Sequence, residues 1–346
     1  MKPIRIDLYS DVVTKPSPAM RDAMRNADVG DEKGGEDPTV NFLNERVANL
    51  LGKESAIFLP SGTMCNAIAV HVFCGRGDEI ILHQTAHTRM FETGGPAALS
   101  GAMLYPMNGD RGIFTSEQVL QAIRPNDPHF PVSRMVWVEQ TANLAGGTIW
   151  SLDEIRDVCT TGKDHGLCCF MDGARLMNAV IATGIDARMY SESFDAVWID
   201  YSKGLGAPVG AGLAGSKAFI QEATRRKFLF GGAMRQAGII AAAALYALDN
   251  NIDRLKDDHT HAQFLYDGIR DIPGLSVRKQ ETNMVFFSIL NNRITAASFN
   301  DHLREYGLRV SVIGTSLMRA VTHLDISTED INEAVSIIRR TADECL

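Results

Sequence analysis

Short apolar runs that alternate with longer amphipathic segments set the strongest limit on how this chain can fold. Continuously apolar strands separated by helices favour a parallel sheet that is covered by helices on both faces. Six runs have the character of such strands: SAIFLP (55–60), EIILHQ (79–84), AMLYPM (102–107), RMVWVEQ (134–140), LCCFMD (167–172) and AVWIDY (196–201). Ligands of sheets of this kind bind at the carboxyl ends of the strands, so the residues that follow these runs are the first place to look for a site.

The region after these strands predicts a second, smaller unit. From Met234 to about Ala262 the alanine-rich segment MRQAGIIAAAALYALDNNIDRLKDDHTHA predicts helix. Strand-like segments, among them LRVSVIG and LMRAVTHLDI, then alternate with helical ones such as TEDINEAVSIIRRTADE. We therefore expect an N-terminal segment and a large α/β domain over residues 1–251, and a small α/β domain over residues 252–346.

Charge and composition exclude several classes of protein. The net charge of −8 argues against binding to nucleic acid, since such domains usually carry a basic face. No apolar stretch has the length of a membrane-spanning helix, and MKPIRIDLYSD lacks the apolar core of a signal peptide. The six cysteines show no C-x-x-C pairing, which fits a reducing compartment. We expect a cytoplasmic enzyme or binding protein.

A strand-to-helix junction follows the first apolar run. FLPSGTMCNAIAV places Ser61, Gly62 and Thr63 between that run and a predicted helix. Free N–H groups at a helix start, with two hydroxyls and a glycine that admits close approach, can cradle a phosphate. Ser and Thr are also the usual N-cap residues, so a plain helix cap is the alternative for this stretch.

The run LCCFMDGAR places Asp172 at the end of a predicted buried strand. An ionised carboxylate in that position needs a partner or a cationic ligand to offset its desolvation. Arg175, three residues further on, is one such partner. Alternatively, Arg175 projects toward the carboxylate of a substrate.

Lys203 follows the run AVWIDY and precedes the small residues GLGAPVGAG. A lysine at a strand end can be desolvated and become a nucleophile; the alternative is a lysine that extends to solvent. The glycines resemble a dinucleotide-binding loop, but the third glycine is Gly210 rather than residue 209, and Pro208 removes a donor N–H. We therefore reject a nicotinamide site.

A metal site is not predicted. His83 and His87 have the i, i+4 spacing of a helical metal pair, but H-Q-T-A-H lacks the glutamate of H-E-x-x-H and no third ligand is evident.

An anion cradle, a buried carboxylate and an isolated lysine on strands of one sheet match the needs of pyridoxal phosphate. The cradle takes the phosphate, the carboxylate keeps the pyridine nitrogen protonated, and the lysine holds the aldehyde as a Schiff base. Taken together, the three strand ends point to this cofactor more specifically than any one of them does alone.

At the level of longer motifs the chain resembles the low-specificity L-threonine aldolases, in the aromatic β-eliminating lyase group of fold-type I pyridoxal phosphate enzymes. The resemblance covers nearly the whole chain, and its landmarks appear in the family's order: DLYSDVVTKPSPAM, GDEKGGEDPTV, FLPSGTMCNAIA, AHTRMFETGG, MDGARLMNAV, SKGLGAPVG, GGAMRQAG and MRAVTHLD. It implies an aspartate aminotransferase-like large domain with a mostly parallel sheet and a small C-terminal α/β domain.

The resemblance also implies roles for single residues. Lys203 would hold the cofactor and Asp172 would pair with its pyridine nitrogen. Gly62 and Thr63, next to Ser61, would bind its phosphate. Ser10, Arg175 and Arg319 would hold the substrate carboxylate. Arg235 of GGAMRQ would reach the phosphate from an adjacent subunit, since the family is homotetrameric and builds its active sites from more than one chain.

Two positions depart from the family pattern. Gly34 stands where the family usually has a tyrosine, and Ala142 of EQTAN stands where a second active-site histidine is expected. The loss of both side chains predicts a roomier pocket around the β-carbon of the substrate, and with it a preference for bulky or aromatic β-hydroxy amino acids such as phenylserine.

The implied reaction is retro-aldol cleavage of L-β-hydroxy-α-amino acids to glycine and an aldehyde. His87 matches the family histidine that stacks on the cofactor, and it is the candidate base for the β-hydroxyl because an imidazole titrates near neutrality. Because a fold does not fix a reaction, β-elimination and transamination are the alternatives. A catalytically silent binding or assembly protein is a third alternative. It is the least favoured of the three, because Lys203 and Asp172 are both present.

Overall fold

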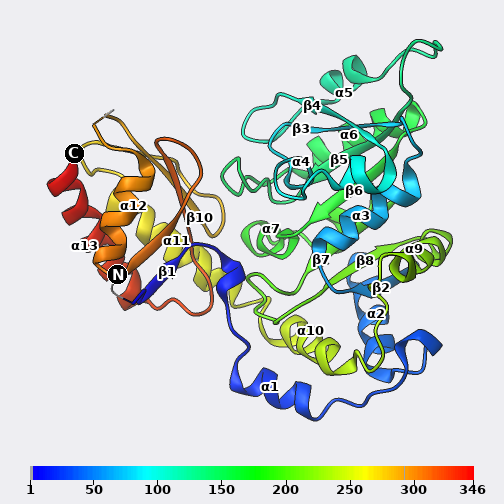
Figure 1. The fold of residues 1–346 in the computed structure, drawn as a ribbon, viewed down its shortest axis with the longest axis horizontal. Coiled ribbons are helices and arrows are strands. Elements are labelled where there is room, and N and C mark those ends of the chain that lie inside the picture. Colours follow the sequence, from blue (N-terminus) through cyan, green and yellow to red (C-terminus); the bar gives the residue numbers. More distant parts are fainter. Residues whose placement is uncertain (1–2, 292) are drawn as a thin grey trace.

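The computed structural model describes residues 3–291 and 293–346, which form two sheets with their helices (Figure 1). The larger sheet has seven strands in the order β2-β8-β7-β6-β5-β3-β4. Their bounds are β2 (Ser55–Leu59), β3 (Glu79–His83), β4 (Met103–Met107), β5 (Ser133–Glu139), β6 (Cys168–Gly173), β7 (Ala196–Asp200) and β8 (Ala211–Gly215). The six predicted strands are all present, and β4, β3, β5, β6 and β7 pair in parallel. The fold-type I α/β prediction is confirmed.

Strand β8 was not predicted, and it is antiparallel to both of its neighbours, β2 and β7. Its sequence, AGLAG, belongs to the run of small residues after Lys203 and carries no strand-forming pattern. The small size has a packing reason: a Cβ at Gly212 would lie 2.1 Å from the hydroxyl oxygen of Tyr201. The strand therefore needs glycine in order to pack, although glycine is a poor strand former.

Helices cover both faces of this sheet, as its continuously apolar strands require. One face packs against α3 (Gly62–Phe73) and α9 (Lys217–Leu229). The other packs against α2 (Pro38–Leu51), α5 (Ser116–Ala122), α6 (Leu152–Asp164), α7 (Leu176–Thr183), α8 (Ala187–Ser191) and α10 (Gly238–Asn250). The short helices α1 (Pro18–Arg25) and α4 (His87–Met90) lie beside them. Single 3₁₀ turns stand at Asp11–Val13 and Glu32–Gly34, and a π-helical turn at Pro96–Ser100.

The smaller sheet has the strand order β1-β11-β12-β10-β9. Its strands are β1 (Ile6–Leu8), β9 (Leu275–Val277), β10 (Met284–Ile289), β11 (Leu308–Val312) and β12 (Leu317–Val321). Helices α11 (Leu255–Ile269), α12 (Ala296–Glu305) and α13 (Thr328–Cys345) pack on it around a separate apolar core. The predicted long helix after Met234 is two helices, α10 and α11, and the domain division at residue 252 stays a prediction.

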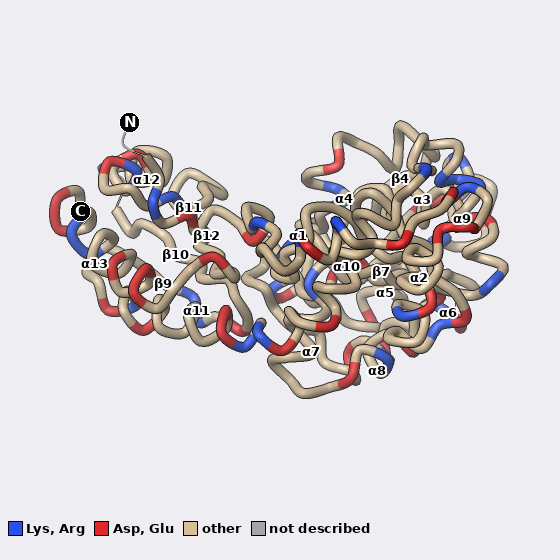
Figure 2. The backbone as a smooth tube through the Cα atoms, turned by 90° about the horizontal axis from the view of Figure 1, so that it is seen from below, with Lys and Arg blue, Asp and Glu red and all other residues tan. Residues whose placement is uncertain are grey.

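Strand β1 joins this smaller sheet by pairing in parallel with β11. The chain then crosses to the larger sheet through Ser10 and Asp11, so both sheets contribute to the space between them. Lys, Arg, Asp and Glu are interspersed along the whole chain in the view of Figure 2. Of the described helices, none combines the length and apolarity that crossing a membrane requires.

Candidate active site

Three neighbouring strands of the larger sheet each end in a carboxylate at one cavity of about 440 Å³. Glu139 ends β5, Asp172 lies near the end of β6, and Asp200 ends β7. The start of α3 and the segment around His87 form further walls, while the smaller sheet contributes Arg319. The cavity therefore lies at the carboxyl edge of the parallel strands, where the strand pattern predicts a ligand site.

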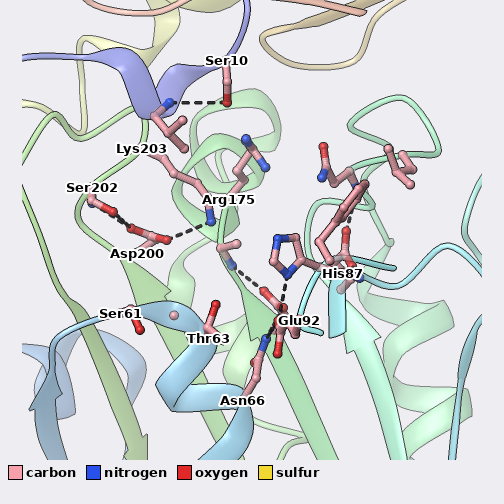
Figure 3. A pocket seen from close by; sticks show the side chains of 18 of the residues that line it. Ser10, Ser61, Thr63, Asn66, His87, Glu92, Arg175, Asp200, Ser202 and Lys203 are labelled. Atoms are coloured by element: carbon pink, nitrogen blue, oxygen red, sulfur yellow. Dashed lines mark hydrogen bonds and ion pairs between the residues drawn. The ribbon is translucent and has the colours of Figure 1, made fainter. Parts of the chain in front are cut away.

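Lys203 points into this cavity and is ion-paired with Asp200, as Figure 3 shows. Its Nζ lies 2.8 Å from Asp200 Oδ2 and 5.5 Å from the centroid of the Trp198 ring. Asp200 also accepts hydrogen bonds from the backbone N–H and the hydroxyl of Ser202, both at 2.7 Å. The amine is thus held at one position in the cavity rather than extended to solvent. Asp200 was missed from the sequence, although it lies one residue before the end of the predicted strand AVWIDY (196–201).

The predicted cradle is the N-terminus of α3, which begins at Gly62. Ser61 acts as the N-cap and accepts a hydrogen bond from the backbone N–H of Met64, so the ordinary cap alternative is also realised. A Cβ at Gly62 would lie 2.2 Å from Cη2 of Trp198. Glycine is therefore needed here for α3 to approach β7 closely. Ser61, Gly62 and Thr63 all line the cavity, which leaves their predicted role in phosphate binding open to test.

Asp172 is fully buried and does not pair with Arg175, contrary to one of the two alternatives from the sequence. Its carboxylate accepts hydrogen bonds from Asn66 Nδ2 and from the backbone N–H of Ala174, each at 3.1 Å. Burial raises the pKa of Asp172, and the nearby positive charges of Lys203 and His87 oppose that rise. Such a carboxylate favours a cationic ligand, because the ligand would replace the stabilisation of its negative charge that burial has removed.

Arg175 pairs with Asp11 instead. Its Nε lies 2.7 Å from Asp11 Oδ2, and both side chains are buried. Although burial opposes it, Arg175 holds the pKa of the Asp11 carboxyl well below its usual range. Asp11 follows β1 and lies 164 residues before Arg175, so no local pattern could have revealed the pair.

Arg319 faces the same cavity from β12. Its Nη1 donates to Asn143 Oδ1 at 2.6 Å and its Nη2 donates to Ser311 at 3.3 Å, while its buried Nε has no partner among the described residues. Burial and the charge of Arg175 lower the pKa of Arg319 to about 10. Two buried guanidinium groups near each other favour an anion between them. Ser10, the cap of the turn Asp11–Val13, lies beside them.

His87 begins a chain of hydrogen bonds that runs from the cavity into the interior and that the sequence did not reveal (Figure 3). Its Nδ1 lies 2.7 Å from Glu92 Oε1, and Asn66 Nδ2 donates to the same oxygen at 2.7 Å. Burial opposes the charged form of His87, but the Glu92 hydrogen bond and the charge of Asp172 together raise its pKa. The spacing of His87 and Glu92 within AHTRMFETGG was the available signal for this pair.

Glu139 forms the wall behind His87. It accepts hydrogen bonds from the backbone N–H groups of His87 at 2.7 Å and Asn143 at 2.8 Å. Burial, with the charge of Asp172, nevertheless raises the pKa of Glu139 to about 7.

Three residues of interest lie outside this cavity. Arg235 is exposed and donates to Asp31 at 2.8 Å. Gly34 lies beside another cavity of about 300 Å³, and Ala142 lines a void of about 10 Å³ behind Glu139. Within one chain, neither Gly34 nor Ala142 lines the cavity that holds Lys203, so the space expected from their small side chains does not arise there.

The remaining residues fit pyridoxal phosphate. The cavity has the volume of a cofactor and substrate site. It brings together an amine, a buried carboxylate, a helix N-terminus and two guanidinium groups. Those groups match the aldehyde, the pyridine nitrogen, the phosphate and an amino acid carboxylate, respectively. The fold and this site define a pyridoxal phosphate-dependent enzyme.

Comparison with known proteins gives the family. The chain matches the model of the β-eliminating lyase family over residues 7–291, and it belongs to that family. It is 39% identical over 332 residues to the low specificity L-threonine aldolase of Escherichia coli (strain K12), covering 96% of this chain and 97% of the relative. It is also 39% identical over 346 residues to the low-specificity L-threonine aldolase 1 of Arabidopsis thaliana, covering 97% and 96%.

Solved structures show the same fold. The Leishmania major threonine aldolase superposes with a TM-score of 0.85 at 20% identity, covering 97% of this chain and 99% of that one. Membership of the β-eliminating lyase family makes the chain a pyridoxal phosphate-dependent lyase, as the resemblance implied.

Proposed function

We propose that this lyase cleaves L-β-hydroxy-α-amino acids to glycine and an aldehyde by a retro-aldol reaction. The observation that carries the proposal is the convergence of the Lys203 amine, the Asp172 carboxylate and the guanidinium groups of Arg175 and Arg319 on one cavity. The relatives named L-threonine aldolase support threonine as a substrate. Allo-threonine and phenylserine belong to the same chemical class.

Five residues would hold the cofactor. Lys203 would bind its aldehyde, Asp172 its ring nitrogen, and Ser61, Gly62 and Thr63 its phosphate. Pyridoxal phosphate, when bound, supplies an electron sink that stabilises negative charge at Cα. The chain supplies the rest: binding, orientation and movement of protons.

Arg175 and Arg319 would bind the substrate carboxylate, with Ser10 beside them. The Asp11 pair fixes the Arg175 side chain through two of its nitrogens, and Asn143 and Ser311 fix Arg319. Two anchored donors set the direction of the amino acid and so determine which bond at Cα is aligned for cleavage. Orientation of this kind accounts for much of an enzyme's rate enhancement.

His87 would take the proton of the β-hydroxyl and lie over the cofactor. The Glu92 carboxylate at its Nδ1 fixes the ring and one tautomer, which leaves Nε2 as the basic nitrogen. This is the arrangement of base and orienting carboxylate found in other proton-transfer sites.

The rim of the cavity favours bulky β-substituents. Four large apolar side chains line it and remain about half exposed: Tyr9 (44%), Val12 (51%), Phe91 (53%) and Val312 (42%). Exposed apolar groups beside a site usually contact a ligand or a partner. We therefore propose phenylserine-type substrates alongside threonine on the basis of this rim.

The products test the proposal. Purified protein with pyridoxal phosphate is incubated with threonine and with phenylserine, and glycine, aldehyde, ammonia and keto acid are measured. Glycine with acetaldehyde or benzaldehyde is the expected result. A keto acid with ammonia would instead indicate β-elimination, a keto acid without ammonia in the presence of an acceptor would indicate transamination, and no turnover would indicate a binding protein. A clearly higher kcat/KM for threonine would contradict the preference for bulky substituents.

We further propose a cytoplasmic homotetramer with shared active sites. Arg235 supports sharing, because it matches a phosphate-binding position of the family motif but lies outside this chain's own cavity, exposed on the surface.

A further inference from the structure

Asn66, on the first turns of α3, uses both ends of its amide inside the protein. Its Nδ2 donates to Glu92 Oε1 at 2.7 Å and to Asp172 Oδ2 at 3.1 Å, and its Oδ1 accepts from Trp198 Nε1 at 2.7 Å. An indole nitrogen can only donate. Trp198 therefore fixes which end of the amide faces the carboxylates. Asn66 itself is 1% exposed, so water does not compete for these bonds.

The amide lies between two buried carboxylates that would otherwise repel each other. Figure 3 shows Asn66 beside Glu92, with His87 on the other side of Glu92. The result is a continuous chain of contacts from His87 through Glu92 and Asn66 to Asp172. Each member of such a network polarises the next in a low-dielectric interior.

Asp172 depends on this contact because its surroundings disfavour charge. Burial raises its pKa and Glu92 adds to the rise, while Lys203, His87 and the Asn66 hydrogen bond lower it. The ionisable groups around it come from every neighbouring element: Cys65 on α3, His87 on α4, Glu92 after it, Glu139 on β5, Asp200 on β7 and Lys203. Among the described residues, Asn66 is the one side chain that donates a hydrogen bond to Asp172, and its amide does not itself titrate.

We propose that Asn66 is a positioning residue that keeps Asp172 charged and couples it to the His87–Glu92 pair. It acts through Asp172 rather than on substrate, and it thereby sets how well Asp172 can hold the protonated ring nitrogen of the cofactor. The inference rests on the proposed roles of Asp172 and His87. A residue that merely anchored α3 would contribute to stability alone.

The test replaces the amide by a side chain of similar volume without hydrogen bonds, Asn66→Leu. In the cofactor-free protein, the infrared band of a protonated carboxyl is followed against pH, and Asp172→Asn identifies the band of Asp172. We expect this band in Asn66→Leu to persist to higher pH than in the parent. In the holoenzyme we expect kcat to fall roughly 10- to 100-fold, the effect of one lost hydrogen bond to a charged group, with KM little changed. An unchanged Asp172 titration would overturn the proposal.

A control and a second variant keep the test decisive. Asn300→Leu removes another buried amide, on α12 of the smaller unit, and should leave the Asp172 band where it is in the parent. If Asn66→Leu does not fold, Trp198→Phe removes the donor that fixes the amide and keeps an aromatic ring between Gly62 and Lys203. It should shift the Asp172 titration in the same direction but less, and no shift would overturn the proposal.

The two proposals fail separately. If the parent protein releases no glycine and aldehyde, the proposed reaction is wrong, but the titration of the cofactor-free protein still tests Asn66. If the parent cleaves its substrates while Asn66→Leu titrates like the parent, only the role of Asn66 is wrong.

Discussion

The Lys203 amine lies 2.8 Å from the Asp200 carboxylate, three residues before it. The turn between them is held by the Ser202 hydroxyl and backbone N–H, which both donate to Asp200. Asp200 is therefore the residue that holds the amine in the cavity before any cofactor arrives. That arrangement explains how a single lysine, surrounded by small residues, is kept in one place.

Replacing Asp200 by Asn should slow attachment of the cofactor. The amide keeps the shape of the side chain but loses the charge-assisted bond that holds the Lys203 amine, which is about twice as strong as a neutral one. It also cannot take up the proton that the amine must release before it attacks the aldehyde. We expect the visible absorbance of the bound cofactor to develop roughly tenfold more slowly in Asp200→Asn after mixing with pyridoxal phosphate. Lys203→Ala should show no such absorbance. Equal rates in Asp200→Asn and the parent would make the ion pair irrelevant to attachment.

Replacing Asp11 by Asn should destabilise the protein and weaken substrate binding. It leaves the buried Arg175 charge without its partner, a change that costs about 3–5 kcal/mol in comparable pairs. The pKa of Asp11 is lower in the folded protein than in the unfolded one. Its contribution to the free energy of unfolding is therefore complete above its unfolded pKa of about 4 and is lost as the pH falls below that value. Denaturant unfolding should therefore show a large difference between parent and Asp11→Asn at pH 7, which shrinks toward pH 2.

The same substitution should raise the KM for the amino acid more than it lowers kcat, because Arg175 is no longer held in place. Asp22→Asn, on the exposed ion pair with Arg25, is the matched control and should change neither property. A stability difference that stays constant from pH 7 to pH 2 would rule out the ion pair as its cause.

The two roles of His87 can be separated by variants. His87→Phe keeps an aromatic ring over the cofactor but cannot accept a proton, so kcat should fall about 10²–10⁴-fold with cofactor affinity nearly retained. In Glu92→Gln the hydrogen bond that raises the His87 pKa is weakened, so the acid limb of the kcat profile should move to lower pH. Normal turnover in His87→Phe would leave His87 as a stacking residue only.

Much of this site follows from the sequence, because its main residues stand at the ends of apolar runs. Lys203, Asp172 and the Ser61–Thr63 stretch are found in this way, since parallel strands bring their carboxyl ends to one edge. Longer motifs add His87, Arg175 and Arg319.

The sequence does not predict which residues form hydrogen bonds and ion pairs with these site residues. Asp11 meets Arg175 only because β1 pairs with β11 in the other sheet. Asn66 faces Glu92 and Asp172 only because α3 packs closely on β7 at Gly62. Contacts of this kind depend on the tertiary packing and have no local pattern. Strand β8 was missed for a related reason: its small residues reflect what packs on it, the Tyr201 hydroxyl, rather than any strand propensity.

Glu139 should make stability fall with rising pH. Its folded pKa of about 7 lies above the unfolded value, so the stabilisation from its protonated form is complete below about pH 4 and is lost as the pH rises through 7. In Glu139→Gln this loss should be absent. Thermal unfolding midpoints of the two proteins should therefore diverge in favour of the variant between pH 5 and pH 8. Parallel pH profiles would mean that Glu139 is ionised throughout.

Mixed oligomers test whether Arg235 serves a neighbouring active site. Lys203→Ala and Arg235→Ala should each be inactive or nearly so, the first because it cannot hold the cofactor and the second because its phosphate loses a cation. If Arg235 acts across the interface, a hybrid of the two variants contains one site with an intact Lys203 and an intact Arg235. Random mixing in pairs of subunits should then restore about a quarter of the parental activity.

The restoration needs exchange of subunits, so the two variants are unfolded together, refolded as a mixture and assayed against each variant refolded alone. The Asp31 carboxylate that Arg235 contacts provides a further check. Adding Asp31→Asn to the Lys203→Ala chain releases the guanidinium of that chain without removing it, so the double variant should complement Arg235→Ala as well as Lys203→Ala alone does. If the refolded mixture is no more active than the two variants refolded separately, Arg235 does not complete a site on another chain.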